Sequence, residues 1–156
     1  MLADLAQRGR TAAEAHERDR ADITGFLASL GFKPIRRFSE MQRTLTDLPQ
    51  GNGESTEVEI EVVAPTRENL EVNVAIENEA FREHFNYRPV NLAELEFWAR
   101  TFSEEGTIFH ISLARVGGTP VGYLWYGYDP KEIAHLKKNR SGLWDIGVLK
   151  PWRNRG

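Results

Sequence analysis

The sequence of 156 residues has no cysteine, two methionines and four histidines. The absence of cysteine excludes a disulfide scaffold, a cysteine-based zinc site and a cysteine nucleophile. The histidines are scattered and form no His-x-x-x-His or histidine–carboxylate spacing, so no metal site is expected. Also lacking are the Gly-x-Ser-x-Gly nucleophile turn, the phosphate loop ending in Gly-Lys-Ser/Thr, and the dinucleotide pattern Gly-x-Gly-x-x-Gly.

Long apolar runs and an excess of basic residues are missing as well. No run approaches the roughly 18 apolar residues of a membrane span, and the first residues lack the basic-then-apolar layout of a signal peptide. A net charge of −3 gives no reason to expect nucleic acid as a partner. We therefore expect a cytoplasmic protein that binds neither membrane nor nucleic acid.

The composition that is present is typical of a globular protein. Apolar residues make up 40% and charged residues 28%, and the length suffices for one domain with a buried core. A polar segment with one proline and two glycines, residues 48–56, predicts a linker. It separates an N-terminal part, residues 1–47, from a C-terminal part, residues 57–156.

Local patterns in the N-terminal part predict two helices and some extended chain. The first helix ends at Gly9. The second covers residues 21–30, with Asp19 as its N-cap and Gly31 directly after its end. Residues 11–17 predict a strand, and residues 32–45 predict one long strand or two strands broken near Ser39.

The C-terminal part alternates strands and helices. Its first strand, residues 57–64, alternates charged residues with valine and isoleucine. Thr66 and Asn91 are the predicted N-caps of two helices, of which the first reaches Pro89. The remaining elements are the second helix (92–102), two strands joined by a Gly-Gly turn (108–116 and 120–128), a polar loop (129–141) and a last strand (143–149).

The last fifteen residues combine an apolar strand with a basic turn. Trp144, Ile146 and Val148 give the strand its character, and Lys150-Pro151 ends it because proline has no N–H for a ladder. The sequence Arg-Asn-Arg-Gly follows. Such a turn after a strand can aim backbone N–H groups at a phosphate, and the alternative is a basic surface turn that closes a hairpin.

These residues resemble the acetyl-CoA motif of the GNAT superfamily of N-acyltransferases, in which Gln/Arg-x-x-Gly-x-Gly/Ala follows a valine-bearing strand. Arg153 matches the first motif position and Gly156 the first glycine, and the final Gly/Ala would fall two residues past the last residue given. Residues 26–38, Phe-Leu-Ala-Ser-Leu-Gly-Phe-Lys-Pro-Ile-Arg-Arg-Phe, resemble the closing segment of a GNAT domain. Residues 78–85, Asn-Glu-Ala-Phe-Arg-Glu-His-Phe, resemble the first helix of tandem, mycothiol-synthase-like members.

The resemblance implies a mixed α/β (α+β) fold with a mainly antiparallel sheet flanked by helices. Residues 1–47 resemble the C-terminal half of one GNAT domain and residues 57–156 the N-terminal half of the next, as in a segment from the middle of a two-domain protein. The halves are expected to assemble into one incomplete unit in circularly permuted order, or to stay apart. Unfilled sheet edges then favour self-association.

The resemblance also implies acetyl-CoA as cosubstrate, without a metal, and an amine of a small molecule as acceptor. The pantetheine arm would lie along the backbone of Val148 and Leu149. The diphosphate would be held by the four residues of the basic turn, Arg153, Asn154, Arg155 and Gly156.

Candidates for proton handling and acceptor binding complete the predicted site. Asp145, on the last strand, is the candidate general base, acting directly or through water, with a solvated or hydrogen-bonded strand residue as the alternative. Glu77 interrupts an apolar helix face and Tyr126 lies on a strand; both are candidate acceptor contacts, or else a helix-edge residue and a packing aromatic. Phe26 stands where the family commonly has a tyrosine acid, so weak or absent catalysis by this chain is expected. The alternative function is a non-catalytic, GNAT-like interaction or degenerate partner domain.

Overall fold

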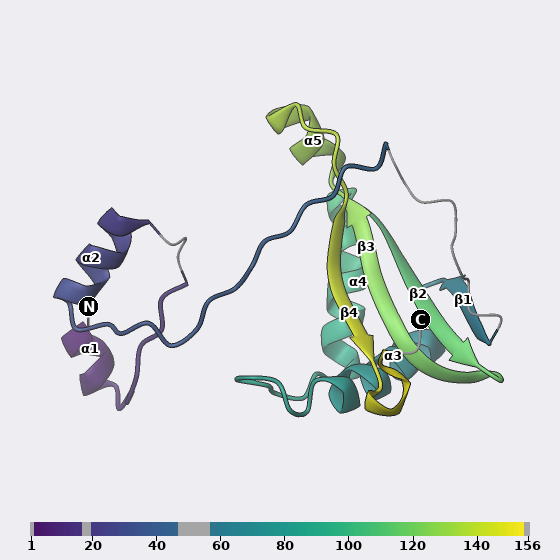
Figure 1. Cartoon of the computed structure of the whole chain (residues 1–156), viewed down its shortest axis with the longest axis horizontal. Coiled ribbons are helices and arrows are strands. Elements are labelled where there is room, and N and C mark those ends of the chain that lie inside the picture. The colour runs from purple at the N-terminus through teal and green to yellow at the C-terminus, as the bar shows by residue number, and fades with distance from the viewer. Residues whose placement is uncertain (1, 17–19, 47–56, 155–156) are drawn as a thin grey trace. The chain divides into compact units, whose positions relative to one another are not determined.

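The computed structural model describes residues 2–16, 20–46 and 57–154 of the chain. The chain divides into two compact units, Met1–Leu48 and Pro49–Gly156 (Figure 1). This division falls at the predicted linker. The likeness of the two units to halves of successive GNAT domains stays a prediction.

Within its described residues, the N-terminal unit contains two short helices, α1 (Leu2–Gln7) and α2 (Ala21–Ser29). Gly31 follows α2 with a φ of +87°, the left-handed conformation predicted for a glycine after a helix end. The predicted N-cap Asp19 lies outside the described residues, and the N-cap position is occupied by Arg20. The strand predictions were wrong, because the described residues 11–16 and 32–45 form neither strand. An extended segment becomes a strand only when a neighbour pairs its backbone groups.

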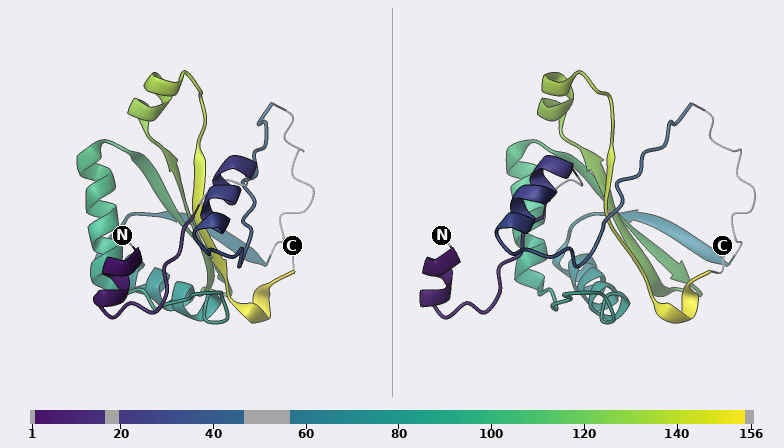
Figure 2. Two further views of the ribbon diagram at one scale, coloured as in Figure 1. Left: turned by 90° about the vertical axis from the view of Figure 1, so that its left-hand side faces the viewer. Right: turned by 60° about the vertical axis from the view of Figure 1, so that its left-hand side comes forward.

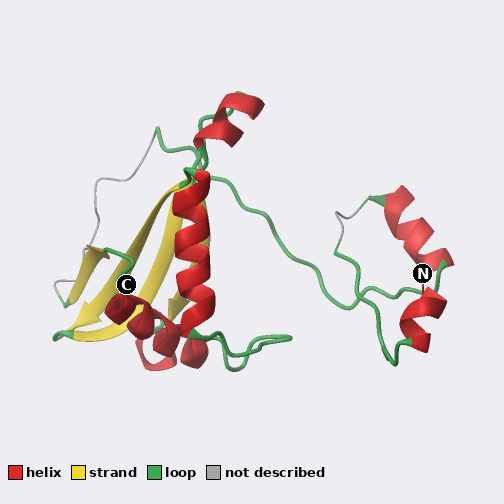
Figure 3. Cartoon of the chain, turned by 180° about the vertical axis from the view of Figure 1, so that it is seen from behind, coloured by secondary structure: helices red, strands yellow, loops and turns green. Residues whose placement is uncertain are grey.

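The C-terminal unit contains a four-stranded antiparallel sheet in the order β1-β2-β3-β4 (Figures 1 and 3). Gly117 and Gly118 both have positive φ and join β2 to β3 in the predicted hairpin. The expected fold class, a mixed α+β fold with an antiparallel sheet flanked by helices, is confirmed. The assembly in circularly permuted order stays a prediction. The strands are β1 (Val58–Val63), β2 (Ile108–Val116), β3 (Thr119–Tyr128) and β4 (Gly142–Val148).

Two helices, α3 (Arg67–Ala80) and α4 (Leu92–Glu105), cover one face of this sheet (Figure 2). Thr66 caps α3 and Asn91 caps α4, each as predicted, by accepting a hydrogen bond from a backbone N–H of the first turn. No helix in the described ranges is both long and apolar enough to cross a lipid bilayer. The core between helices and sheet is formed by Leu70, Ile76, Leu95, Ala99, Ile111, Leu113, Tyr123 and Trp125.

Two further predictions were wrong, one about the end of a helix and one about a loop. Helix α3 stops at Ala80 rather than near Pro89, because the Asn78 side chain holds the following loop. Its amide donates to the carbonyl of Val90 and accepts from the Val90 N–H, a long-range contact that helical periodicity cannot reveal. The predicted loop 129–141 contains a helix, α5 (Pro130–Leu136), that begins with an Asp129 cap and a proline at its first position.

The opposite face of the sheet carries exposed apolar side chains. Val62, Ser112, Leu124 and Ile146 form one cross-strand row there, since their positions pair in register from β1 to β4. In this row Val62 and Ile146, on the two edge strands, are each 59% exposed and Ser112 is buried, whereas on the helix-covered face the residues of the central strands, such as Leu113 and Trp125, are at most 5% exposed. Helices α3 and α4 therefore pack on one face of the sheet, and the candidate site lies on that face.

Candidate functional site

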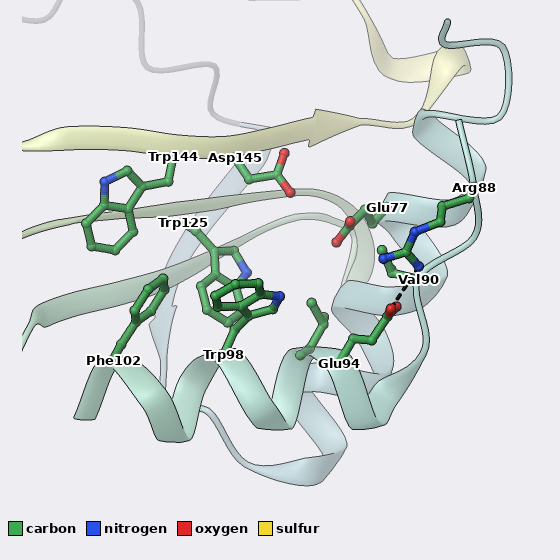
Figure 4. A pocket seen from close by; sticks show the side chains of 10 residues that line it. Glu77, Arg88, Val90, Glu94, Trp98, Phe102, Trp125, Trp144 and Asp145 are labelled. Atoms are coloured by element: carbon green, nitrogen blue, oxygen red, sulfur yellow. Dashed lines mark ion pairs between the residues drawn. The ribbon is translucent and has the colours of Figure 1, made fainter. Parts of the chain in front are cut away.

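A β-bulge in β4 places two consecutive side chains on the helix-covered face of the sheet. Trp125 pairs with Asp145 and Tyr126 with Leu143, so Trp144 is an extra residue without a partner in β3. In a regular strand, neighbouring side chains point to opposite faces. The bulge instead lets the side chains of Trp144 and Asp145 line the same pocket (Figure 4).

Two glycines lie against the indole of Trp144. A β-carbon at Gly142 would lie 2.7 Å from Trp144 Cδ1, whereas one at Gly127 would first meet the backbone of β2, at the Ile108 carbonyl and Phe109 Cα, and then Trp144 Cη2 at 2.9 Å. Real β-carbons do not approach other heavy atoms so closely. Neither glycine has a positive φ, so close approach rather than backbone conformation is the reason for glycine at both positions.

The pocket has a volume of about 190 Å³ and lies between α3, α4, β3, β4 and the loop before α4 (Figure 4). Aromatic side chains form one part of its wall and charged side chains the other. The sequence analysis identified two of its residues, Glu77 and Asp145. The full lining is Glu77, Arg88, Val90, Glu94, Leu95, Trp98, Phe102, Trp125, Trp144 and Asp145.

Glu77 is the carboxylate whose acidity the pocket alters most. Its pKa is raised to about 7, chiefly because burial disfavours the charged form and also because the negative charge of Asp145 faces it. A hydrogen bond of 3.2 Å from Asn73 Nδ2 to Glu77 Oε2 acts in the opposite direction. A carboxyl group with a pKa near 7 exchanges protons readily at neutral pH, which is the property of a general base.

Asn73 connects this carboxylate to the core. It is fully buried, and its Oδ1 accepts a 2.7 Å hydrogen bond from the indole N–H of Trp125. The amide thus fixes the Trp125 ring with one end and Glu77 with the other. The sequence analysis missed Asn73. The feature of the sequence that could have revealed it is its position: Asn73 is a polar residue at the spacing of a buried helix face, three positions from both Leu70 and Ile76.

Asp145 is held by a neighbouring tyrosine. The Tyr123 hydroxyl donates a 2.7 Å hydrogen bond to Asp145 Oδ2. Burial raises the pKa of Asp145, while the bonds from Tyr123 and from the Ile146 N–H partly offset that rise. Burial and the same aspartate raise the pKa of Tyr123 strongly, so the phenol stays protonated as a donor.

The loop before α4 supplies the outer charged residues of the pocket. The Asn78 side chain, which also accepts a 2.8 Å bond from the Tyr87 hydroxyl, fixes the backbone at Val90. Arg88 forms an ion pair of 2.8 Å with Glu94, drawn as a dashed line in Figure 4. Glu94 also completes the cap of α4 by accepting from the Asn91 N–H. The charge of Arg88 is therefore already balanced by Glu94.

A second pocket, of about 400 Å³, lies at the C-terminal end of β4 and the end of α3. Ile146, Gly147 and Val148 line it, together with Phe81 and other residues after α3. The Leu149 N–H bonds the carbonyl of Val121 in β3, and the Leu149 carbonyl accepts from Trp152. Because N–H groups alternate along a strand, the N–H of Val148 points to the open edge of β4. Of the two predicted pantetheine contacts, Val148 directs its N–H to this edge, and Leu149 uses its backbone groups within the fold.

The basic turn is tied to α3 by its first arginine. Strand β4 ends at Val148 as predicted, and Lys150–Trp152 forms a 3₁₀ turn, η1. Arg153 Nε donates to the carbonyl of Val148 at 2.9 Å and Arg153 Nη2 to that of Ala80 at 2.7 Å. Arg153 thereby satisfies a carbonyl at the C-terminus of α3. Asn154 has a φ of +60°, and the predicted diphosphate residues Arg155 and Gly156 lie outside the described residues.

Tyr126 lies apart from both pockets. Its ring lies 5.2 Å from that of His110, on the sheet face opposite Trp125, and it is not among the residues that line either pocket. In the part of the chain that is described, no three histidine or carboxylate side chains are grouped to hold a metal ion. The aromatic wall was missed because Trp98, Phe102, Trp125 and Trp144 are residues that equally often form a core.

Comparison with known proteins gives structural matches alone: no family model and no curated protein matches the chain. An N-acetyltransferase from Staphylococcus aureus Mu50 has 21% identity and a TM-score of 0.46, over 64% of this chain and 58% of that one. A ribosomal-protein-alanine N-acetyltransferase from Brucella melitensis has 25% identity and a TM-score of 0.46, over 63% and 58%. The PaiA N-acetyltransferase from Thermoplasma acidophilum, solved with coenzyme A, has 13% identity and a TM-score of 0.40, over 63% and 62%. The chain covers about three-fifths of the length of these structures.

Proposed function

We propose that the C-terminal unit carries the acceptor site and part of the cosubstrate site of an N-acyltransferase that moves an acetyl group from acetyl-CoA to the amine of a small molecule. The motif resemblance around Arg153 supports the proposal from the sequence. The arrangement of the two pockets supports it from the structure. The tandem organisation implied by the resemblance belongs to the same proposal.

One observation carries the proposal: consecutive residues of β4 line the two pockets. Asp145 lines the smaller pocket, which also contains Glu77, and Ile146 lines the larger pocket, which extends along the edge of the strand. A transferase of this kind must bring an amine and a thioester together, so its two binding sites must meet. The adjacent residues Asp145 and Ile146, which line the two pockets, support such an arrangement at one peptide unit of β4.

The residues of the smaller pocket suit the proton chemistry of amide formation. An alkylamine enters as an ammonium ion, and its nitrogen attacks only after it loses a proton. Glu77, with a pKa near 7, can take up that proton, and Asp145 adds negative charge that favours the cation on entry. The nitrogen then bonds to the acyl carbon, the carbon–sulfur bond breaks, and the second amine proton leaves with the sulfur as a thiol.

The edge of β4 suits the extended, amide-containing arm of coenzyme A. The outward N–H of Val148 can donate a hydrogen bond to a carbonyl of that arm, in the way that an edge strand donates to a strand added beside it. Gly147 also lines the larger pocket, and a β-carbon there would meet the rings of Tyr123 and Phe81, so the close packing at this point requires glycine. Acetyl-CoA, when bound, supplies the activated acyl group. Arg153 contributes by holding β4 and α3 together, because its Nε and Nη2 groups already donate to two carbonyls.

A titration with coenzyme A tests the cosubstrate site, with the backbone amide signals in NMR as the readout. We expect shifts for Gly147 and Val148, and smaller shifts for strand β1 at the far edge of the sheet. The same titration with adenosine 3′,5′-bisphosphate, which lacks the pantetheine arm, should leave the Val148 signal in place. If coenzyme A leaves the β4 amides unmoved, the cosubstrate assignment is wrong.

Acetyl transfer to an amine panel, monitored by thiol release, tests the base. The expected rate is low, and Glu77→Gln should lower it by about 10²-fold. Glu79→Gln is the matched control, since Glu79 lies on the same helix, is exposed and pairs with Arg82. Equal rates for the two variants would remove Glu77 from the mechanism.

The second candidate function is a non-catalytic, GNAT-like interaction module. It is favoured by the exposed sheet face, on which Ile60 is 75% and Ile146 59% exposed. Self-association through this face or the sheet edges belongs to the same candidate. Sedimentation of the protein at rising concentration, with and without coenzyme A, separates the two: a stable dimer that binds no coenzyme A favours the module.

A further inference from the structure

The smaller pocket has an aromatic end with Phe102 at its centre. The Phe102 ring lies 5.1 Å from that of Trp144, 6.1 Å from Trp98 and 6.4 Å from Trp125, measured between centroids. Trp98 is 50% and Trp144 42% exposed, so both offer ring surface to a ligand. A contiguous group of exposed aromatic rings beside a pocket is a surface that can bind a ligand. This end of the pocket suits a flat apolar group.

The other end of the pocket is acidic. It contains the carboxyl groups of Glu77, Glu94 and Asp145 and one cation, Arg88, which is paired with Glu94. No ion pair within the described ranges involves Glu77 or Asp145. The pocket therefore carries an excess of negative charge, which attracts a cation and repels a carboxylate.

The volume limits the ligand to a small molecule. A cavity of roughly 150 Å³ is known to hold one benzene ring. The present pocket, at about 190 Å³, has room for one ring and a short alkyl chain. In Figure 4 the rings of Phe102 and Trp144 lie at one end and Glu77 lies toward the other, so such a chain can bridge them.

We propose that the acceptor is a small arylalkylamine that enters as its ammonium form, with its ring against Trp98, Phe102 and Trp144 and its nitrogen between Glu77 and Asp145. As the identity of an acceptor, this inference rests on the proposed function. An aromatic amino acid is a poorer ligand, because Arg88 already pairs with Glu94 and no other cation lines the pocket. An aliphatic diamine lacks the ring that the aromatic end binds.

Calorimetric titration of the full chain, without acetyl-CoA, tests the proposal with 2-phenylethylamine as the probe. Three matched compounds each change one feature: phenylalanine adds a carboxylate, 2-phenylethanol removes the charge, and 1,4-diaminobutane removes the ring. We expect 2-phenylethylamine to bind at least about tenfold more tightly than each of them. Equal or tighter binding of the diamine or of phenylalanine would overturn the proposal.

Variants place the binding in this pocket. Trp98→Leu should weaken 2-phenylethylamine binding by roughly three- to tenfold, and Trp98→Phe should restore most of the loss. Tyr128→Leu is the control, because Tyr128 is also an exposed aromatic residue but does not line the pocket. Equal effects of the two leucine variants would contradict the proposal.

Because the calorimetric titration contains no acetyl-CoA, it tests the class of amine ligand independently of the proposed transferase activity. Ring-dependent amine binding, with no response of the β4 amides to coenzyme A, would leave the ligand class intact and reject the transferase. Acetyl transfer to 1,4-diaminobutane in preference to 2-phenylethylamine would support the transferase and reject the ligand class. Circular dichroism of each variant identifies any loss of fold, in which case Gly142→Ala, described below, provides the second variant.

Discussion

The indole N–H of Trp125 donates a 2.7 Å hydrogen bond to Oδ1 of Asn73, which has no solvent exposure. The other end of the same amide donates to Glu77. A buried amide that is fully hydrogen-bonded fixes its partners, and one that loses a partner is costly. The position of the candidate base is thus set by a contact between α3 and the middle of β3.

Asn73→Ala should destabilise the fold by about 2 kcal/mol, because the indole N–H would stay buried without its acceptor. The same variant should raise the pKa of Glu77 further, since the bond from Asn73 lowers it. Urea unfolding measures the first effect and NMR titration of the Glu77 carboxyl carbon the second. Glu71→Ala is the control and should change neither, because Glu71 is exposed on the same helix and its ion pair with Arg67 contributes little.

Glu77→Gln should alter the dependence of stability on pH. The folded pKa of about 7 lies above the unfolded value near 4.5, so the wild-type fold loses stability as pH rises between these values. Below pH 4.5 the carboxyl is protonated in both states and causes no loss. The variant should therefore match the wild type at pH 4 and exceed it by about 1 kcal/mol at pH 8, after allowance for solvent screening. Equal differences at the two pH values would show that Glu77 has an ordinary pKa.

Arg153→Ala should loosen the last turn of α3, because the carbonyls of Ala80 and Val148 would lose a charged donor. The expected destabilisation is about 1–2 kcal/mol. Hydrogen exchange of the α3 amides should become faster near Ala80. Lys150→Ala is the comparison: its ion pair with Glu83 is exposed, and exposed pairs contribute little. Equal exchange rates in both variants would argue against a stabilising role of the Arg153 hydrogen bonds at the end of α3.

Gly142→Ala should change the pocket without changing the fold. The three atoms nearest to the added methyl group would all belong to the indole of Trp144, and Gly142 has no positive φ. We expect a several-fold weaker affinity for 2-phenylethylamine, similar in size to the effect of losing an aromatic contact. Calorimetry measures the affinity and urea unfolding the stability. A large fall in stability would show that the methyl group meets more than the indole.

The sequence was most informative where a local rule determines the structure. The caps Thr66 and Asn91, the Gly117-Gly118 hairpin and the end of β4 all follow from side-chain or backbone chemistry within a few residues. The exception is α5, whose Asp129-Pro130 start is also a local signal, although the polar composition of residues 129–141 predicts a loop. Residues 32–45 were wrongly predicted as strand because pairing depends on a distant partner.

The candidate site was predicted only in part, because its geometry depends on long-range contacts. Glu77 and Asp145 were identified from their own positions in a helix and a strand. The link through Asn73 and the loop set by Asn78 join residues that are 52 and 12 positions apart. A pattern of apolar residues does not reveal which polar side chain meets which. The bulge at Trp144 was likewise invisible, since an extra residue leaves no mark in an alternating apolar run.

The extra residue in β4 makes two properties of the pocket separable. Because Trp144 stands outside the ladder, its side chain can change in size while Asp145 keeps its partner in β3 and its bond to Tyr123. Natural or laboratory selection can therefore change which molecule the pocket binds without changing the contacts that set the pKa of Asp145. Substitution at this single position is the simplest route to variants of this fold with new preferences.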